Sequence, residues 1–305
     1  MTNHRTVSTK LLWIMLLSAV SASCASQDGE ATERAYANDV LVDTEWMEAH
    51  TEDSSVRVVE VGGNAEAFGE GHLPEASFLA MRGLSNPDDP VRGQIATRAQ
   101  VSTAVSGIGV GRDQTVVLYD RQNNLQAARA YWVLKYYQHP DVRIYNGGAP
   151  KWTADGRTLT TETTEYEPSN YPAGAADPEI RTTWQYVVDH TDDPATLFCD
   201  TRSPDEHLGL DVRAERGGHI PGSINVEWTA AVNSNGTFKP ADELAALYGG
   251  AGFTSDRQII TYCQSGVRGA HTWFVLSELL GYPSVRNYDG SWGEYGNNPE
   301  SPIES

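Results

Sequence analysis

The strongest chemical signal in the sequence is a cysteine, Cys263, followed closely by an arginine, Arg268. A short apolar run at 257–263 predicts a strand before the cysteine, and the pattern at 267–281 predicts a helix after it. The glycine between them permits a tight turn that aims backbone N–H groups at the sulfur. The helix N-terminus and the arginine also favour a thiolate. We therefore predict a nucleophile at Cys263 rather than a buried structural cysteine.

The length of this loop separates two kinds of chemistry. The residues between Cys263 and Arg268 are Gln264, Ser265, Gly266 and Val267. Cysteine-based phosphatases resemble this loop, but they have one residue more between the two ends. The shorter ring suits a single sulfur atom and crowds a tetrahedral phosphate. The length therefore favours sulfur transfer, with phosphate hydrolysis as the weaker alternative.

Three short motifs occur twice along the chain. The pairs are Gly71-His72-Leu73-Pro74 with Gly218-His219-Ile220-Pro221, Val116-Val117-Leu118-Tyr119 with Ile259-Ile260-Thr261-Tyr262, and Tyr145-Asn146-Gly147 with Tyr288-Asp289-Gly290. The last two pairs are each separated by about 143 positions, which is far longer than a solenoid repeat. The sequence therefore predicts a duplicated domain.

Each copy alternates short apolar strands with helical patterns. The strands are expected at 56–61, 115–120, 142–148, 195–202, 257–263 and 284–290, and the helices at 97–109, 125–137, 241–252 and 267–281. Continuous apolar strands between helices predict an α/β fold with a parallel sheet covered on both faces. We expect a first domain at 37–155, a linker at 156–177 and a second domain at 178–305.

The two copies differ at the decisive position. Asp120 follows Tyr119 where Cys263 follows Tyr262, and a carboxylate cannot accept sulfur. The first domain should therefore be inactive and form a wall of the cleft. Glu60, Arg202 and Glu206 are interpreted as structural ion-pair or turn residues, and Cys199 as a buried, inert thiol.

In combination these motifs resemble those of the tandem-domain rhodaneses, which are sulfurtransferases. The likeness covers nearly the whole chain after residue 36 and includes Asp200-Thr201-Arg202-Ser203 and Tyr288-Asp289-Gly290-Ser291-Trp292. It implies two rhodanese-like domains and ping-pong transfer through a persulfide on Cys263. It also implies that residues 264–268 bind the donor and that His72 is a candidate for assisting proton transfer. Glu206 and His207 stand where family members often have an arginine, and we expect Arg213 to compensate for this departure. His219 is expected to be structural.

The resemblance leaves two donors open. Ser265, Gly266 and Val267 match the loop associated with 3-mercaptopyruvate, whereas Arg268 matches the loop associated with thiosulfate. We favour thiosulfate because a doubly charged donor suits the permanent charge of an arginine. A small anionic donor and a thiophilic acceptor, cyanide or a thiol, are the expected partners. A non-catalytic persulfide-binding or sulfur-relay module is the alternative from another functional class.

The N-terminus and the overall charge bear on location and partners. Residues 1–23 combine a basic start, an apolar run and small residues, which predicts a signal peptide, and 24–36 predicts a tether. Cys24 is a candidate for lipidation, so the protein is expected to be exported, either periplasmic or a membrane-anchored lipoprotein. The net charge of -19 argues against nucleic-acid binding. We expect no metal, no cofactor and a monomer.

Overall fold

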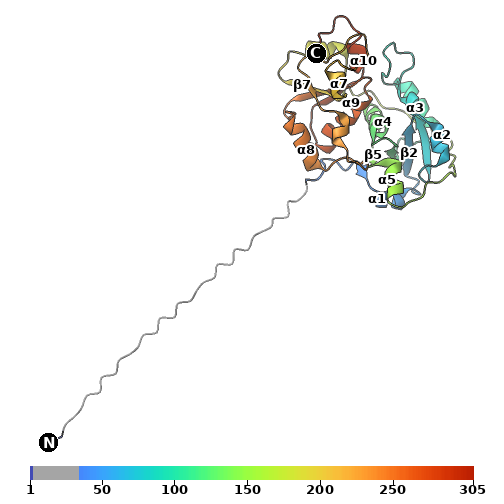
Figure 1. Ribbon diagram of the computed structural model, residues 1–305. Helices are drawn as coiled ribbons and strands as arrows, with labels where there is room; N and C mark the ends of the chain where they lie inside the picture. Colours follow the sequence, from blue (N-terminus) through green and yellow to red (C-terminus); the bar gives the residue numbers. More distant parts are fainter. Residues whose placement is uncertain (3–33) are drawn as a thin grey trace. The chain divides into compact units, whose positions relative to one another are not determined.

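The computed structural model describes residues 1–2 and 34–305 (Figure 1). The predicted signal peptide, Cys24 and most of the predicted tether lie outside the described residues. The described residues from 34 onward belong to one compact unit. Within the described part of the chain, no helix is both long and apolar enough to cross a bilayer.

The architecture consists of two five-stranded parallel sheets with the same strand order. The first sheet is β1-β5-β4-β2-β3, with β1 at Leu41–Val42, β2 at Val56–Gly62, β3 at Ala76–Ala80, β4 at Thr115–Tyr119 and β5 at Val142–Tyr145. The second sheet is β6-β10-β9-β7-β8, with β6 at Arg181–Thr182, β7 at Thr196–Asp200, β8 at Ile224–Asn225, β9 at Gln258–Tyr262 and β10 at Val285–Tyr288. The predicted duplication of an α/β fold is confirmed.

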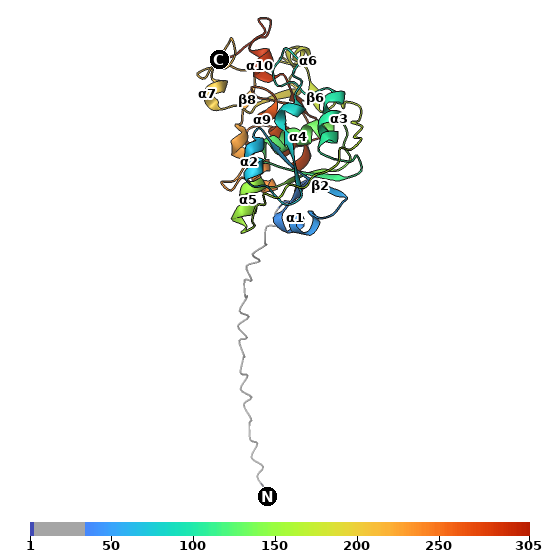
Figure 2. The ribbon, with the colours of Figure 1, turned by 90° about the vertical axis from the view of Figure 1, so that its right-hand side faces the viewer.

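Helices connect the strands in both halves (Figures 1 and 2). In the first half these are α1 (Thr44–His50), α2 (Ala65–Glu70), the short 3-10 helix Met81–Leu84, α3 (Arg98–Gly107), α4 (Leu125–Tyr136) and α5 (Gly148–Ala154). In the second half these are α6 (Trp184–Asp189), α7 (Pro204–His207), the 3-10 helix Trp228–Ala231, α8 (Ala241–Gly250), α9 (Val267–Trp273), a π-helical segment (Phe274–Leu279) and α10 (Ser291–Tyr295). The four predicted helices correspond to α3, α4, α8 and α9 with its π-helical extension.

The two halves share one hydrophobic core, in which α4 packs against α9. Tyr131 of α4 meets Phe274 edge to face at 4.7 Å between ring centroids, and Trp273 lies 6.4 Å away. These rings, together with Trp132, are fully buried, as the sequence predicts for core residues. Because aromatic side chains bury large apolar areas, this contact is a main attachment between the halves.

The loops before α4 and α9 differ in length by one residue. Three residues separate Cys263 from the start of α9, whereas four separate Asp120 from the start of α4. The α9 helix and its π-helical segment are together one residue longer than α4, so the following strands return to the same register. Val142 pairs with Val116, and Val285 pairs with Ile259 at the matching position.

The segment predicted as a linker packs on the first half. Thr160 forms a backbone bridge to His72, and the N–H of Ser169 donates to the carbonyl of Ser106 at 2.9 Å. Tyr171 is buried, and the guanidinium of Arg57 lies 3.3 Å from the ring centroid of Tyr166. The connection is therefore part of the folded body.

Candidate active site

Cys263 lies at the carboxyl end of β9, in the turn that leads into α9. Gly266 makes this turn with a φ of 76°, and a Cβ there would lie 2.7 Å from the carbonyl oxygen of Asp289. Its own carbonyl accepts hydrogen bonds from Asn287 Nδ2 at 3.1 Å and from the N–H of Ala270 at 3.0 Å. Glycine is required here both by the left-handed backbone and by the close approach of a neighbouring chain segment.

The side chain of Ser291 holds the backbone of the Cys263 turn through hydrogen bonds. Its Oγ accepts hydrogen bonds from the N–H groups of Cys263 at 3.1 Å and Gly266 at 3.0 Å, and donates to the carbonyl of Tyr288 at 2.8 Å. The same Oγ lies 4.0 Å from the sulfur, and the backbone φ of Ser291 is 52°. A left-handed serine is strained, which points to a functional role. The sequence motif contains Ser291, but sequence reasoning gave it no role.

The first half shows what such a turn can hold. The carboxylate of Asp120 accepts four backbone N–H groups, which come from Gln122 at 2.8 Å, Asn124 at 3.1 Å, Gln126 at 2.7 Å and Ala127 at 3.0 Å. Burial raises the pKa of Asp120, although these four N–H groups act in the opposite direction. The turn is therefore a cradle of amides around an acceptor side chain.

In the second half, the amides at the same helix positions are free. Gln126 and Ala127 are the second and third residues of α4, and Arg268 and Gly269 are the second and third residues of α9. Within 34–305, no protein group accepts the backbone N–H groups of Ser265, Arg268 or Gly269. Cys263 is 1% exposed, so its sulfur lies in a buried turn with unpartnered donors. Unpartnered amides at the start of a helix are donors that suit an anionic group.

The side chain of Arg268 is paired with a carboxylate. Its Nη1 and Nη2 donate to the two oxygens of Glu206 at 2.6 and 2.9 Å. Burial alone would raise the pKa of Glu206, but the hydrogen bonds and charge of Arg268 lower it to about 2. Arg213 lies 3.6 Å from the same carboxylate and pairs with Asp211 at 2.6 Å. Both arginines predicted to bind donor are therefore paired with carboxylates, Arg268 with Glu206 and Arg213 mainly with Asp211.

Glu206 also belongs to the helix that presents it. Ser203 caps α7, and the side chain of Glu206 accepts the backbone N–H of Ser203 at 3.1 Å in a capping box. Arg202 pairs with Asp200 at 2.6 Å, and Glu60 pairs with Arg121 at 2.7 Å. The structural interpretation of Glu60, Arg202 and Glu206 agrees with these contacts, and Cys199 is fully buried as expected.

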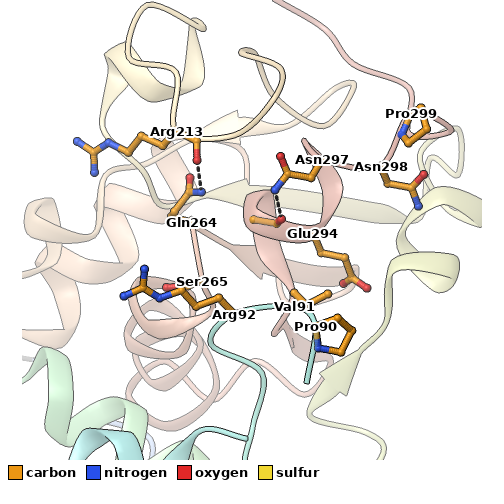
Figure 3. A pocket seen from close by; sticks show the side chains of 11 residues that line it. Pro90, Val91, Arg92, Arg213, Gln264, Ser265, Glu294, Asn297, Asn298 and Pro299 are labelled. Atoms are coloured by element: carbon orange, nitrogen blue, oxygen red, sulfur yellow. Dashed lines mark hydrogen bonds between the residues drawn. The ribbon is translucent and has the colours of Figure 1, made fainter. Parts of the chain in front are cut away.

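A pocket of about 810 Å³ opens beside the cysteine loop (Figure 3). It is lined by Pro90, Val91, Arg92, Arg213, Gln264, Ser265, Gly293, Glu294, Asn297, Asn298 and Pro299. Gln264 is held by a hydrogen bond from its Nε2 to the carbonyl of Arg213 at 2.9 Å. Val267 begins α9 and does not line this pocket. The lining joins a loop of the first half to the predicted catalytic loop.

The structure does not bring His72 to this pocket. The His72 ring is fully buried and stacks on Phe68 at 3.9 Å. Its Nδ1 lies 2.9 Å from the carbonyl of Phe68, and its Nε2 lies 3.2 Å from the carbonyl of Glu162. In the second half, His219 Nδ1 likewise contacts the carbonyl of His207 at 2.8 Å. Both histidines hold their turns in place.

A buried ion pair fixes the first half against the catalytic loop. Arg129 of α4 donates to Asp289 at 2.7 Å, and both side chains are at most 1% exposed. Asp289 also accepts the N–H of Ile95 at 2.6 Å, and Arg129 donates to the carbonyl of Gly93 at 3.0 Å. This contact was not predicted from the sequence, because neither residue belongs to a motif that indicates its partner.

Comparison with known proteins places this geometry in a family. The rhodanese-like domain model matches residues 43–155 and 183–298. The chain is 42% identical over 276 residues to the sulfur carrier protein TtuD of Thermus thermophilus, covering 87% of this chain and 96% of that protein. It is also 42% identical over 275 residues to a provisionally named thiosulfate sulfurtransferase of Saccharopolyspora erythraea, covering 88% and 96%.

Solved structures give the same result. The crystal structure of SseA from Escherichia coli, described as a 3-mercaptopyruvate sulfotransferase, matches with a TM-score of 0.76 and 29% identity. The match covers 83% of this chain and 98% of SseA. The family model matches both halves, and the chain belongs to the rhodanese family of sulfurtransferases, with two rhodanese-like domains in tandem.

Proposed function

We propose that this chain is a thiosulfate sulfurtransferase that carries the transferred sulfur as a persulfide on Cys263. In this reaction the thiolate attacks the outer sulfur of thiosulfate, and the electron pair of the broken S–S bond leaves with sulfite. A cyanide ion or a thiol then removes the outer sulfur and regenerates the thiolate. The first half contributes a wall of the pocket and carries no sulfur, because Asp120 occupies the nucleophile's position.

The observation that carries this proposal is the pairing of a buried cysteine with unpartnered amides. In the first half the same kind of turn directs four N–H groups at Asp120. In the second half the N–H groups of Arg268 and Gly269 have no protein acceptor within the described part of the chain. Hydrogen bonds from such donors would stabilise the terminal sulfur of a persulfide better than they would a neutral thiol.

The choice of donor has support on both sides. The relative from Saccharopolyspora erythraea is named for thiosulfate, whereas SseA is described as acting on 3-mercaptopyruvate. The ion pair with Glu206 compensates the charge of Arg268, which weakens the sequence argument for thiosulfate. We keep thiosulfate as the first candidate and 3-mercaptopyruvate as the second, since Ser265-Gly266-Val267 matches the pattern associated with the latter.

The test is a direct observation of the intermediate. Protein treated with thiosulfate, and separately with 3-mercaptopyruvate, is analysed by intact mass and then by peptide mass. A gain of one sulfur, about 32 Da, on the peptide containing Cys263 is expected, followed by its loss on adding cyanide with formation of thiocyanate. A gain with 3-mercaptopyruvate alone would transfer the assignment to that donor. No gain with either donor would reject the proposal.

A sulfur relay is a second candidate, favoured by the name of the Thermus thermophilus relative. A relay takes up sulfur once and releases it to a specific partner, whereas an enzyme turns over with small acceptors. Steady-state formation of thiocyanate, measured over many equivalents of protein, distinguishes the two. A single burst equal to the protein concentration, with no further turnover, would favour the relay.

Export and lipidation are proposed from the sequence alone. The basic start, apolar run and small residues before Cys24 support cleavage near residue 23. N-terminal mass analysis of protein from its native cells should find residues 1 to about 23 removed. A lipid on Cys24 would identify an anchored lipoprotein, and an intact Met1 would contradict export.

A further inference from the structure

An unpaired cation lines the pocket and comes from the half that carries no nucleophile. Arg92 is exposed, and within residues 34–305 its guanidinium makes no ion pair and no hydrogen bond. The other two arginines of the site, Arg213 and Arg268, both lie against Glu206. Arg92 is therefore the guanidinium next to the cysteine loop whose charge is available to a ligand.

The backbone that carries Arg92 is held against the catalytic loop. Gly93 has a φ of 94°, and a Cβ there would lie 2.9 Å from both Cβ and the carbonyl oxygen of Ser265. The carbonyl of Gly93 accepts a hydrogen bond from Arg129, which is itself fixed by Asp289. In Figure 3 the side chain of Arg92 extends from the loop of the first half toward Ser265. Its place beside the catalytic loop is thus set by packing and a buried ion pair.

We propose that Arg92 is a donor-binding residue that holds the anionic group of the sulfur donor during persulfide formation. This inference rests on the proposed function. With thiosulfate, Cys263–S⁻ and ⁻S–SO₃⁻ give Cys263–S–S⁻ and SO₃²⁻, so that one S–S bond forms and another breaks. The negative charge gathers on the leaving sulfite. A guanidinium beside the sulfite oxygens would bind the donor and stabilise this leaving group.

The net negative charge of the protein makes a local cation such as Arg92 more important for binding an anionic donor. The chain has 41 acidic and 22 basic residues, so its overall field repels a dianion. Glu294 adds an acidic side chain to the lining of the same pocket. An anionic donor therefore needs a local positive charge that no protein carboxylate compensates, and Arg92 meets this requirement.

The experiment compares three variants in the first half-reaction. Rates of sulfite release and persulfide formation are measured over a range of thiosulfate concentrations for Arg92→Ala, Arg92→Lys and Arg257→Ala. Arg257 is an exposed arginine at the opposite end of β9 from Cys263 and serves as the matched control. We expect Arg92→Ala to lower kcat/KM about 10- to 100-fold, Arg92→Lys to lose less, and Arg257→Ala to match the wild type.

The second half-reaction separates donor binding from a structural effect. Persulfide loaded beforehand onto Arg92→Ala should react with 2-mercaptoethanol, a neutral acceptor, at the wild-type rate. A loss in Arg92→Ala no larger than in Arg257→Ala, or an equal slowing of both half-reactions, would overturn the proposal.

Two further readouts keep the inference separate from the choice of donor. If only 3-mercaptopyruvate loads the wild type, the same comparison is made with that carboxylate donor. Independently of turnover, sulfite should protect Cys263 from alkylation by iodoacetamide at a lower concentration in the wild type than in Arg92→Ala. Equal protection in the two proteins would reject Arg92 as the anion-binding residue, even if persulfide formation succeeds.

Discussion

The turns at Asp120 and Cys263 show which features the two copies of the duplicated domain share and which differ. Both follow the central strand of a parallel sheet, and both lead into the helix at the interface between the halves. In the first turn the carboxylate of Asp120 takes up the amides itself. In the second turn, which has a thiol instead, the amides of Arg268 and Gly269 have no acceptor among the residues that the structure describes. The second and third helix positions thus carry amides that bind Asp120 in the first turn, and amides that remain available in the second turn.

Two further differences accompany the change of residue. Gly148 takes the place of Ser291, as the matching bonds from Ala149 to the Asp120 carbonyl and from Trp292 to the Cys263 carbonyl show. The first turn is also one residue longer. The serine hydroxyl and the shorter turn therefore distinguish the second half, and placing a cysteine in the first turn alone should not convert one turn into the other.

The largest effect is expected for the nucleophile. Cys263→Ser should abolish thiocyanate formation, because a hydroxyl neither forms a persulfide nor ionises readily at neutral pH. Cys199→Ser should retain most activity, since Cys199 lies in β7 and its burial raises the pKa of its thiol well above the ordinary value. Steady-state assays check both. Substantial turnover by Cys263→Ser would contradict the assignment of the catalytic half.

The next largest effect is expected for the buried ion pair between Arg129 and Asp289, which joins the two halves. Arg129→Met removes one partner of a buried ion pair that joins the halves and leaves Asp289 with the more distant Arg181, at 3.5 Å, as its cationic partner. Such a loss costs about 3–5 kcal/mol in the free energy of unfolding. The control Arg286→Met breaks a pair whose glutamate partner, Glu179, is exposed, and should cost at most about 1 kcal/mol. Urea unfolding measures both, and equal costs would show that the pair contributes little to joining the halves.

A smaller effect, dependent on pH, is expected for Glu206 of the catalytic half. Its pKa in the folded chain is about 2, below the ordinary glutamate value of 4.5, so its ionised form stabilises the fold. Glu206→Gln should lower the free energy of unfolding by about 1.5–3 kcal/mol at pH 7, the value of hydrogen bonds to a charged group. The contribution is complete above pH 4.5 and is lost as the pH falls toward 2. A difference from wild type that stays constant between pH 7 and pH 3 would exclude this electrostatic origin.

The smallest effect is expected from giving the first turn its own cysteine. In a Cys263→Ser background, Asp120→Cys should gain no sulfur from thiosulfate, since the longer turn lacks a serine beneath it. Gln126, the second residue of α4, takes the place of Arg268 and bonds to Gln122 at 2.8 Å. Intact mass analysis decides the outcome. A stable gain of about 32 Da would show that the amide cradle alone is sufficient.

The sequence alone predicts much of this comparison. The spacing of the repeated motifs predicts the duplication, and the apolar runs predict the central strands. The presence of Asp120 in one copy and Cys263 in the other predicts which half is catalytic. These features are local, so period and composition reveal them. The helix expected at 267–281 corresponds to α9 and its π-helical extension, although the change of helix type after Trp273 was not foreseen.

What the sequence could not predict depends on contacts between distant residues. Arg268 and Glu206 are 62 positions apart, and Arg129 and Asp289 are 160 positions apart. No local pattern indicates that Glu206 pairs with Arg268, or that Arg92 of the first half lines the pocket. Such pairings follow from the way the two sheets pack and become visible only in the folded chain.

The π-helical segment has a consequence for engineering the size of the active site. The π-helical segment Phe274–Leu279 contains the one extra residue that offsets the shorter turn before α9. A change in the length of the turn therefore needs an opposite change in the length of the helix to keep the next strand in register. One residue inserted between Gly266 and Val267, with one removed from Phe274–Leu279, would reproduce the spacing of the first half without displacing β9 or β10. Such a matched edit would enlarge the anion cradle while preserving the scaffold. The duplicated half thus serves as a template, within the same chain, for a wider active-site ring.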